Sequence, residues 1–187
     1  PGSDLDTAAV SANGRWAAVE QHDGIVRVWE VAATAQVRGR FRAPEGARLR
    51  AVDARGRSLF SHAEGFWRID VAGRVEPLSQ GFPARVVSVR ADASVAVLER
   101  EGLLYWTVLD GSVAPVPFTA VAAAGAAAFA PDGSGFAVVD PVQGSVRLFD
   151  AASRRVVLRA SAPDATAVAV GPSSRVVVVG RQDGRVS

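Results

Sequence analysis

The sequence predicts an all-β fold of repeated, four-stranded antiparallel sheets, and three observations lead to this prediction. Acidic residues that each end an apolar stretch recur every 40 residues, at Glu30, Asp70, Asp110 and Asp150. An acidic or amide residue followed by glycine lies upstream of each, and a turn signal such as Asn13-Gly14 lies further upstream. A period near 40 with short strands and glycine turns is the signature of a β-propeller blade.

Each repeat is expected to hold four strands, and residues 129–150 (FAPDGSGFAVVDPVQGSVRLFD) show the pattern best. For the first two units we expect strands at 7–10, 16–20, 25–30 and 37–42, and at 49–53, 58–61, 66–70 and 75–77. For the next two we expect them at 86–90, 95–99, 103–109 and 113–116, and at 126–130, 136–139, 146–150 and 156–160. A fifth unit begins with strands at 165–170 and 175–180, so the chain carries about four and a half blades.

The turns between these strands explain most of the recurring acids and glycines. Asp, Asn and Gly supply the backbone conformations and local hydrogen bonds that tight hairpins need. We therefore assign a structural turn role to Asp23, Gly24, Asp132, Gly133, Gly144, Asp183 and Gly184. A ring of carboxylates at Asp23, Glu64, Glu101 and Asp183, with Gln143, is the alternative, since such rings bind cations, but the turn role is favoured.

Several strands are apolar on both faces, which fits blades packed between two neighbours. Trp29, Trp67 and Phe149 are expected to pack between blades. The last strand of each blade should be polar on its free edge, and arginines at alternate positions, 38, 40 and 42, match this. The Ala-rich segment 120–130 has helical propensity, yet its register with the other units favours a loop followed by a strand.

Composition excludes several classes of site. The chain of 187 residues has no Cys, two His and a net charge of +2, and all 21 basic residues are Arg. Disulfides and thiolate chemistry are thus excluded, and the charge does not favour nucleic acid as a partner. No apolar run reaches the roughly 18 residues of a membrane helix. Residues 1–3 resemble a scar left by tag cleavage. A cytoplasmic location is slightly favoured over a periplasmic one.

The repeats SANGRWAAVEQHDGIVRVWEVA and FAPDGSGFAVVDPVQGSVRLFDAA resemble WD40 repeats, and the resemblance extends from Leu5 to the C-terminus. It implies a divergent, bacterial-type WD40 propeller over residues 4–187. The blades would cover about 5–43, 47–79, 84–118, 124–161 and a truncated 164–187. The family's Gly-His pair is missing, so its buried Asp-His-Ser/Thr-Trp tetrad cannot form here with its histidine.

Because WD40-like propellers usually close with more blades, three interpretations of the chain stay open. It is an excerpt of a longer propeller, a half-ring completed by a second copy, or an ordered fragment of a disordered chain. The excerpt is favoured, since an open ring exposes apolar faces and unpaired strand edges.

Candidate binding residues cluster in the first two units. Seven arginines lie between positions 38 and 57, and Arg48 and Arg50 among them could grip an acidic protein segment. His22 and His62 occupy equivalent turns, where a metal site is the alternative to two exposed turn residues. Arg85 follows in the connection 80–85, which with loop 44–48 would present variable side chains to a partner.

The function expected from these features is non-catalytic. The chain should be a protein–protein interaction or scaffold domain of a larger bacterial protein, without cofactor, binding a partner through loops on one face. The alternatives are an extracytoplasmic sensor or ligand-binding propeller and, less favoured, a propeller hydrolase.

Overall fold

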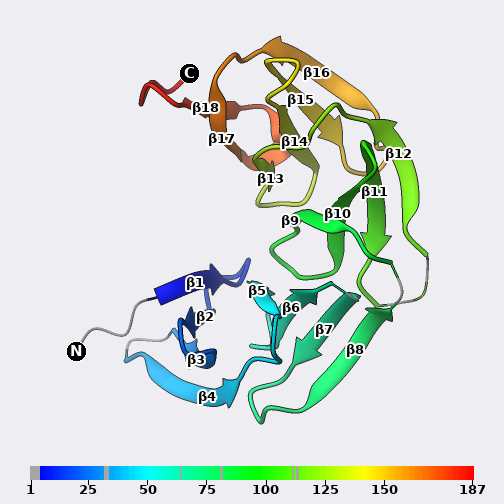
Figure 1. Cartoon of the computed structure of the whole chain (residues 1–187). Helices are drawn as coiled ribbons and strands as arrows, with labels where there is room; N and C mark the ends of the chain where they lie inside the picture. Colours follow the sequence, from blue (N-terminus) through cyan, green and yellow to red (C-terminus); the bar gives the residue numbers. More distant parts are fainter. Residues whose placement is uncertain (1–4, 32–33, 64, 81, 111, 113) are drawn as a thin grey trace. The chain divides into compact units, whose positions relative to one another are not determined.

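The computed structural model describes residues 5–31, 34–63, 65–80, 82–110, 112 and 114–187. Within them the strands form four four-stranded sheets and one two-stranded sheet, and each sheet keeps the order of its strands in the sequence (Figure 1). The chain groups into two compact units, one of residues 1–84, 91–95 and 108–114 and one of residues 85–90, 96–107 and 115–187. The expected tag scar, residues 1–3, lies outside the described residues.

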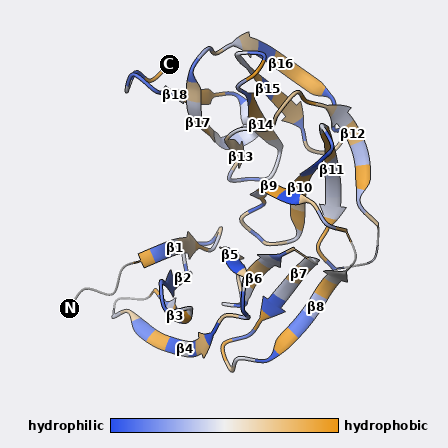
Figure 2. Ribbon diagram, in the orientation of Figure 1, coloured by the Kyte–Doolittle hydropathy of each residue, from blue (hydrophilic) through white to orange (hydrophobic). Residues whose placement is uncertain are grey.

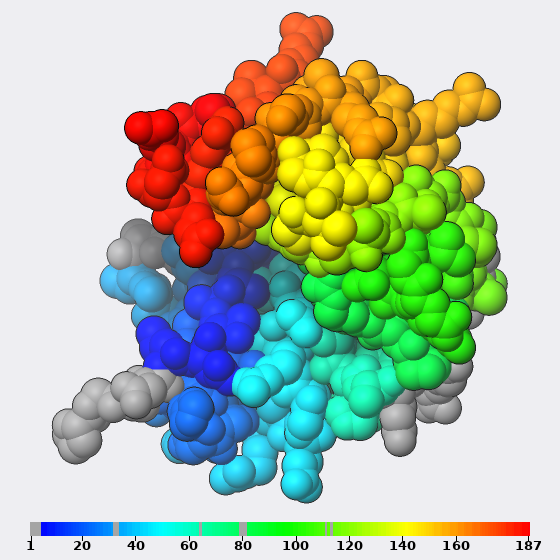
Figure 3. All heavy atoms as spheres, turned by 45° about the horizontal axis from the view of Figure 1, so that its top comes forward, coloured from blue at the N-terminus to red at the C-terminus, as the bar shows by residue number. Residues whose placement is uncertain are grey.

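The first unit contains two complete sheets. The first sheet consists of β1 (Leu5–Val10), β2 (Trp16–Gln21), β3 (Ile25–Glu30) and β4 (Gln36–Arg42). The second consists of β5 (Arg48–Val52), β6 (Ser58–His62), β7 (Gly65–Ile69) and β8 (Val75–Gln80). Strands β1 and β2 both contact β5, and the blue and cyan atoms of these strands adjoin in Figure 3. One apolar cluster that includes Val26, Val28, Leu49 and Phe60 joins the two sheets.

The second unit contains two more complete sheets and a partial one. Except for Val95 and Val108, which group with the first unit, the third sheet comprises β9 (Arg85–Val89), β10 (Val95–Arg100), β11 (Leu103–Val108) and β12 (Val116–Ala120). The fourth comprises β13 (Ala127–Phe129), β14 (Gly135–Asp140), β15 (Ser145–Asp150) and β16 (Val156–Ser161). The fifth holds β17 (Ala165–Val170) and β18 (Val177–Arg181), joined through the short 3-10 helix η1 (Pro172–Ser174). The fold is a β-propeller, with four four-stranded blades and part of a fifth.

Burial of β14 shows why inner strands are apolar throughout. All six of its residues are buried. Phe136 and Val138 belong to a cluster with Phe149, whereas Ala137 and Val139 belong to a second cluster with residues of β17 and β18. Alternate side chains of one strand thus enter two cores, as expected for a strand packed on both faces.

The three aromatic residues that were expected to pack between blades, Trp29, Trp67 and Phe149, differ in burial. Phe149 is fully buried, and Trp67 packs against the core of the first unit while half-buried. Trp29 is also half-buried, but the tryptophan of the first sheet that packs against this core is Trp16. Alternation along β3 explains this, because Val26 and Val28 point into the core and their neighbour Trp29 therefore points to the other face.

The acid-and-glycine turns have the geometry that their sequence predicts. Asp23, Asp132 and Asp183 each accept a hydrogen bond from the backbone N–H two residues further on, at 2.9, 3.0 and 3.0 Å. Gly24 and Gly133 have φ values of 76° and 72°, a region in which a residue with a Cβ is strained. Each acid therefore caps its own turn.

The structure corrects one expectation about the chain between the third and fourth repeats and agrees with another. The last strand of the third repeat lies at Val116–Ala120, not at 113–116. Residue 113 itself is outside the described residues. The ring of Phe118 packs against the rings of Phe136 and Phe149, with centroids 5.7 and 5.6 Å apart. These contacts explain why the strand includes Phe118 and lies later in the sequence than expected. Residues 120–130 form no helix and end in β13, as the register favours. Within the described residues no helix has the length and apolarity to cross a membrane.

The outer strands are not equally polar. On β4 the side chains of Arg38, Arg40 and Arg42 are exposed while Gly39 is buried, so the expected polar edge is present there. Strand β16 departs from it, because Val157 and Leu158 are 59% and 46% exposed, and its ribbon shows long hydrophobic stretches in Figure 2. The prediction of a polar outer edge is thus wrong for this blade.

Replacement of Gly39 by Ala should destabilise the first unit. A Cβ at Gly39 would lie 2.7 Å from the backbone oxygen of Val71 and 3.1 Å from its Cα, so the two sheets would have to move apart. We expect Gly39→Ala to lower the free energy of unfolding by about 1–3 kcal/mol, measured by urea denaturation. Arg40→Ala, an exposed neighbour on the same strand, is the control and should change it little. An unchanged stability of Gly39→Ala would show that this close approach is absent.

Candidate functional site

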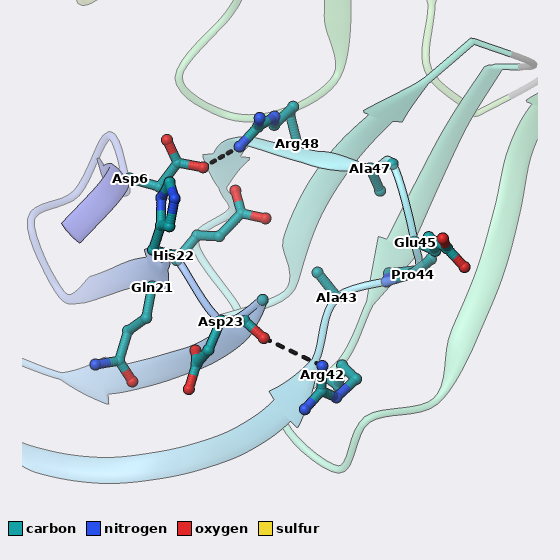
Figure 4. Close-up of a pocket in the computed structure, with 13 residues that line it drawn as sticks. Asp6, Gln21, His22, Asp23, Arg42, Ala43, Pro44, Glu45, Ala47 and Arg48 are labelled. Carbon is teal, nitrogen blue, oxygen red and sulfur yellow. Dashed lines mark hydrogen bonds and ion pairs between the residues drawn. The ribbon is translucent and has the colours of Figure 1, made fainter. Parts of the chain in front are cut away.

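A cavity of about 560 Å³ in the first unit is the candidate site. The turn between β2 and β3 forms one wall, the connection between β4 and β5 forms the other, and Asp6 of β1 lies at its edge (Figure 4). We name it the 42–48 cavity after the residues of that connection. Two of the five predicted partner-binding residues, His22 and Arg48, line it.

Hydrogen bonds hold the two walls together. Arg42 Nη1 donates to the backbone oxygen of Asp23 at 3.1 Å, and the backbone N–H of Ala43 donates to the oxygen of Gly24 at 2.8 Å. Within the loop, Ala47 N–H donates to the oxygen of Pro44 at 3.0 Å. The loop that the sequence singled out as a recognition loop therefore has a defined shape.

Arg48 and Arg50 have different surroundings although both belong to β5. Arg48 is exposed and forms an ion pair and hydrogen bond with Asp6. Arg50 Nε donates to Ser61 Oγ at 2.7 Å. Desolvation, and then the neighbouring charge of Arg48, lower the pKa of Arg50, while the carboxylate of Glu20 opposes this. The guanidinium stays charged at neutral pH but does not line the cavity.

The two histidines are not brought together as metal ligands. His22 is exposed in the β2–β3 turn, whereas the His62 ring stacks on Trp67 with centroids 5.0 Å apart and planes at 12°. A Cβ at Gly46 would lie 3.3 Å from His62 Nε2, so the loop rests against this ring. Among the described residues no group of three or more His, Asp or Glu could hold a metal ion. The geometry fits packing for His62 and a turn position for His22.

Arg85 is the one predicted partner-binding residue that does not belong to the first unit. It belongs to the second unit, where its side chain pairs with Glu99 at 2.8 Å and donates to the backbone oxygen of Ala124. Its guanidinium thus joins β9 to β10 and to the loop before β13. A partner-binding role for Arg85 stays a prediction.

The cluster of seven arginines between positions 38 and 57 is partly neutralised. Arg38 pairs with Glu30 at 2.8 Å and Arg57 with Asp53 at 2.7 Å, in addition to the pair of Arg48. Within the described part of the chain the other four members of the cluster have no ion pair, namely Arg40, Arg42, Arg50 and Arg55. Three of the seven charges are thus matched by acids of the chain, and a partner-binding role for the cluster stays a prediction.

Glu20 is a residue of the cavity that the sequence analysis missed. Its side chain lines the cavity although the residue is only 3% exposed. Glu20 Oε2 accepts a hydrogen bond of 3.0 Å from the backbone N–H of Leu49, which ties β2 to β5. The signal was an acid at an inward position of an alternating strand, two residues after the buried Ala18, where an apolar residue is the rule.

Comparison with known proteins identifies the fold. No protein-family profile matches the sequence, and no curated protein matches it. The β-propeller domain of Myceliophteria thermophila Cps50 (Swd1) is similar in structure, with a TM-score of 0.65, 17% identity, and coverage of 98% of this chain and 64% of that one. A chain in the crystal structure of the Mitotic Checkpoint Complex is similar with a TM-score of 0.72, 17% identity, and coverage of 98% and 60%.

These likenesses support the fold that the WD40-like repeats predict, a divergent WD40-like β-propeller. The chain spans less than two thirds of the length of either structure.

Proposed function

We propose that this WD40-like propeller chain is a protein-interaction module that binds a segment of a partner protein at the 42–48 cavity. The single observation behind the proposal is the cavity itself, which gathers His22 and Arg48 on two walls joined by hydrogen bonds. Loops held on a rigid sheet scaffold bind with little loss of conformational entropy. We further propose that the chain is part of a larger protein of bacterial type.

The composition of the cavity favours binding over catalysis. Its lining residues include no Ser, Thr, Tyr or Lys, and the chain contains no Cys, so the nucleophiles that most covalent mechanisms use are missing from this site. The fold alone does not decide function. One of the similar structures is part of a complex named for the mitotic checkpoint, which agrees with a role in protein assembly.

An acidic group on the partner would find its best counterpart at Arg50. Arg50 lies on β5 two residues after Arg48, which lines the cavity. Within the described residues its guanidinium donates one hydrogen bond, to Ser61, and has no carboxylate partner. Arg48 keeps Asp6 as its partner and adds its positive charge to the surroundings of Arg50. Charge-assisted, bidentate contacts of this kind give specificity as well as affinity.

A peptide selection tests the proposal. Peptides selected from a random library on the whole chain should bind at least about tenfold more weakly to the double variant Arg48→Glu/Arg50→Glu, since charged hydrogen bonds contribute about 1.5–3 kcal/mol. The matched control reverses two exposed arginines of the second unit, Arg155→Glu/Arg175→Glu, and should bind as the unchanged chain does. Equal affinity of both double variants would refute the assignment to this cavity.

A ligand-binding propeller is the second candidate, because the cavity volume of about 560 Å³ lies within the roughly 300–1,000 Å³ of small-molecule sites. Such sites are mostly apolar, however, whereas six of the thirteen residues that line this one carry a charge. A small molecule that competes with every selected peptide would favour this candidate.

A further inference from the structure

We propose that the 42–48 cavity accepts a cationic side chain, the guanidinium of an arginine or the ammonium of a lysine in the partner segment, against the carboxylate of Glu20. This inference rests on the proposed function, since it names the chemistry that the same cavity recognises. It differs from the acidic group placed at Arg50, which lies outside the cavity.

The charges that line the cavity favour a cation. Four carboxylates and two guanidinium groups line it, so acids exceed bases by two. The carboxylates belong to Asp6, Glu20, Asp23 and Glu45, and the guanidinium groups belong to Arg42 and Arg48. Both cations already have partners within the protein, the backbone oxygen of Asp23 for Arg42 and the carboxylate of Asp6 for Arg48. An anion entering the cavity would therefore meet an excess of negative charge.

Of the four acids, Glu20 has the strongest reason to bind a ligand. The carboxylate of Asp6 is paired with Arg48, and Asp23 Oδ1 caps its own turn by accepting from Ile25 N–H. Glu45 is exposed, where an ion pair contributes little. Glu20 is almost fully buried, and an ionised carboxylate in such a place is costly unless a cation or several donors compensate it.

The hydrogen bonds of Glu20 leave room for that cation. Its carboxylate has two oxygens that can accept about four hydrogen bonds. Oε2 takes the Leu49 N–H, whereas within the described residues Oε1 has no donor and Glu20 has no ion pair. Between Arg50 and Glu20 there is a Coulombic attraction, but within the described residues the two side chains form no hydrogen bond or ion pair. A guanidinium or ammonium in the cavity would supply the missing donors and the opposite charge together.

An NMR titration of the whole chain with methylguanidinium chloride at constant ionic strength tests the inference. We expect a saturable shift of the Leu49 backbone amide, which donates to Glu20, and of Gly24 and Ala47 at the cavity walls. Sodium acetate, a model of an acidic side chain, should not shift Leu49. The inference is overturned if methylguanidinium causes no saturable change at Leu49, or if acetate causes an equal change. The unchanged chain suffices for this test.

Glu20→Gln then isolates the charge. Glutamine keeps the shape and an oxygen that can accept from Leu49 N–H, so the spectrum should stay that of the folded chain while methylguanidinium binds at least about tenfold more weakly. Glu76→Gln, which removes an exposed carboxylate outside the cavity, should leave the affinity unchanged. Unchanged binding by Glu20→Gln would contradict the role of this carboxylate.

The two proposals can fail separately. If selected peptides respond to Arg48→Glu/Arg50→Glu but methylguanidinium does not reach Leu49, the cavity binds a partner and the cationic side chain is wrong. If methylguanidinium binds but every selected peptide ignores the cavity, the pocket for a cation stands and the peptide-binding role fails.

Discussion

Phe136→Ala is expected to lower the free energy of unfolding of the second unit by about 3–5 kcal/mol, the usual cost of removing a buried Phe. Phe136 is fully buried and lies at the centre of an aromatic cluster. Its ring stacks on Phe149 with centroids 4.8 Å apart and planes at 5°. Three further rings contact it at 5.3–5.7 Å, those of Trp106, Phe118 and Phe129.

The loss should be large because the rings around Phe136 come from four other strands, which belong to two sheets. Phe118 comes from β12, Trp106 from β11 and Phe129 from β13, so the space left by the ring has walls that cannot collapse together. Urea denaturation followed by tryptophan fluorescence measures the change. Leu158→Ala on the exposed β16 is the control and should cost far less. A loss below about 1 kcal/mol for Phe136→Ala would contradict a close-packed aromatic core.

Arg147→Ala is expected to cost about 3–5 kcal/mol because it leaves a buried carboxylate without its counterion. Arg147 Nη2 pairs with Asp140 Oδ2 at 2.8 Å, and Asp140 is fully buried. Arg147 Nη1 also donates to the backbone oxygen of Ala120 at 2.9 Å. Asp140 accepts from the N–H groups of Ala122 and Gln143, each at 3.1 Å.

This pair braces the loop before the fourth blade against its second strand. In the family that the repeats resemble, a tetrad with a histidine has the bracing role, and that histidine is missing here. We therefore expect Asp140→Asn to be milder than Arg147→Ala, since asparagine keeps an oxygen for one of the two backbone donors and leaves no buried negative charge without a counterion. If Arg147→Ala were the milder change, the pair would not be the brace.

The pH dependence of the same variants follows from the sign of the pKa shift. Burial raises the pKa of Asp140, but hydrogen bonds from Gln143, Ala122 and Arg147 outweigh burial and lower it below its ordinary value of 3.8. Because the pKa of Asp140 is lower in the folded state than in the unfolded state, its carboxylate stabilises the fold fully above the unfolded-state pKa. This stabilisation is lost as pH falls through the folded-state pKa. Arg147→Ala should therefore lose this contribution at a higher pH, as melting temperatures across the acidic range would show.

Strand positions were predictable where the signal is local. The strand Ile25–Glu30 matches its expected bounds, because a glycine turn precedes it and four of its six residues are apolar. The prediction for the last strand of the third repeat was wrong because the position of this strand depends on ring contacts of Phe118 with Phe136 and Phe149. Both residues lie far along the chain from Phe118. Propensity alone cannot include such contacts.

The candidate site shows the same division. Loop 44–48 and the exposed positions of His22 and Arg48 were predictable from turns and charge. The hydrogen bond of Glu20 was not, because its donor, Leu49, lies 29 residues further along the chain. The ion pairs within the arginine cluster were not predictable either, for a related reason. Asp6, the partner of Arg48, lies 42 residues away, and a sequence does not show which acids will neutralise which bases.

Hydrogen–deuterium exchange of the whole chain, with and without a selected peptide, most directly tests whether the 42–48 cavity is the recognition site. We expect the peptide to slow exchange in residues 42–49 and 21–25 of the unchanged chain, and we expect Glu20→Gln and Arg48→Glu/Arg50→Glu to abolish this protection. Protection confined to other segments, such as the exposed strand β16, would contradict it.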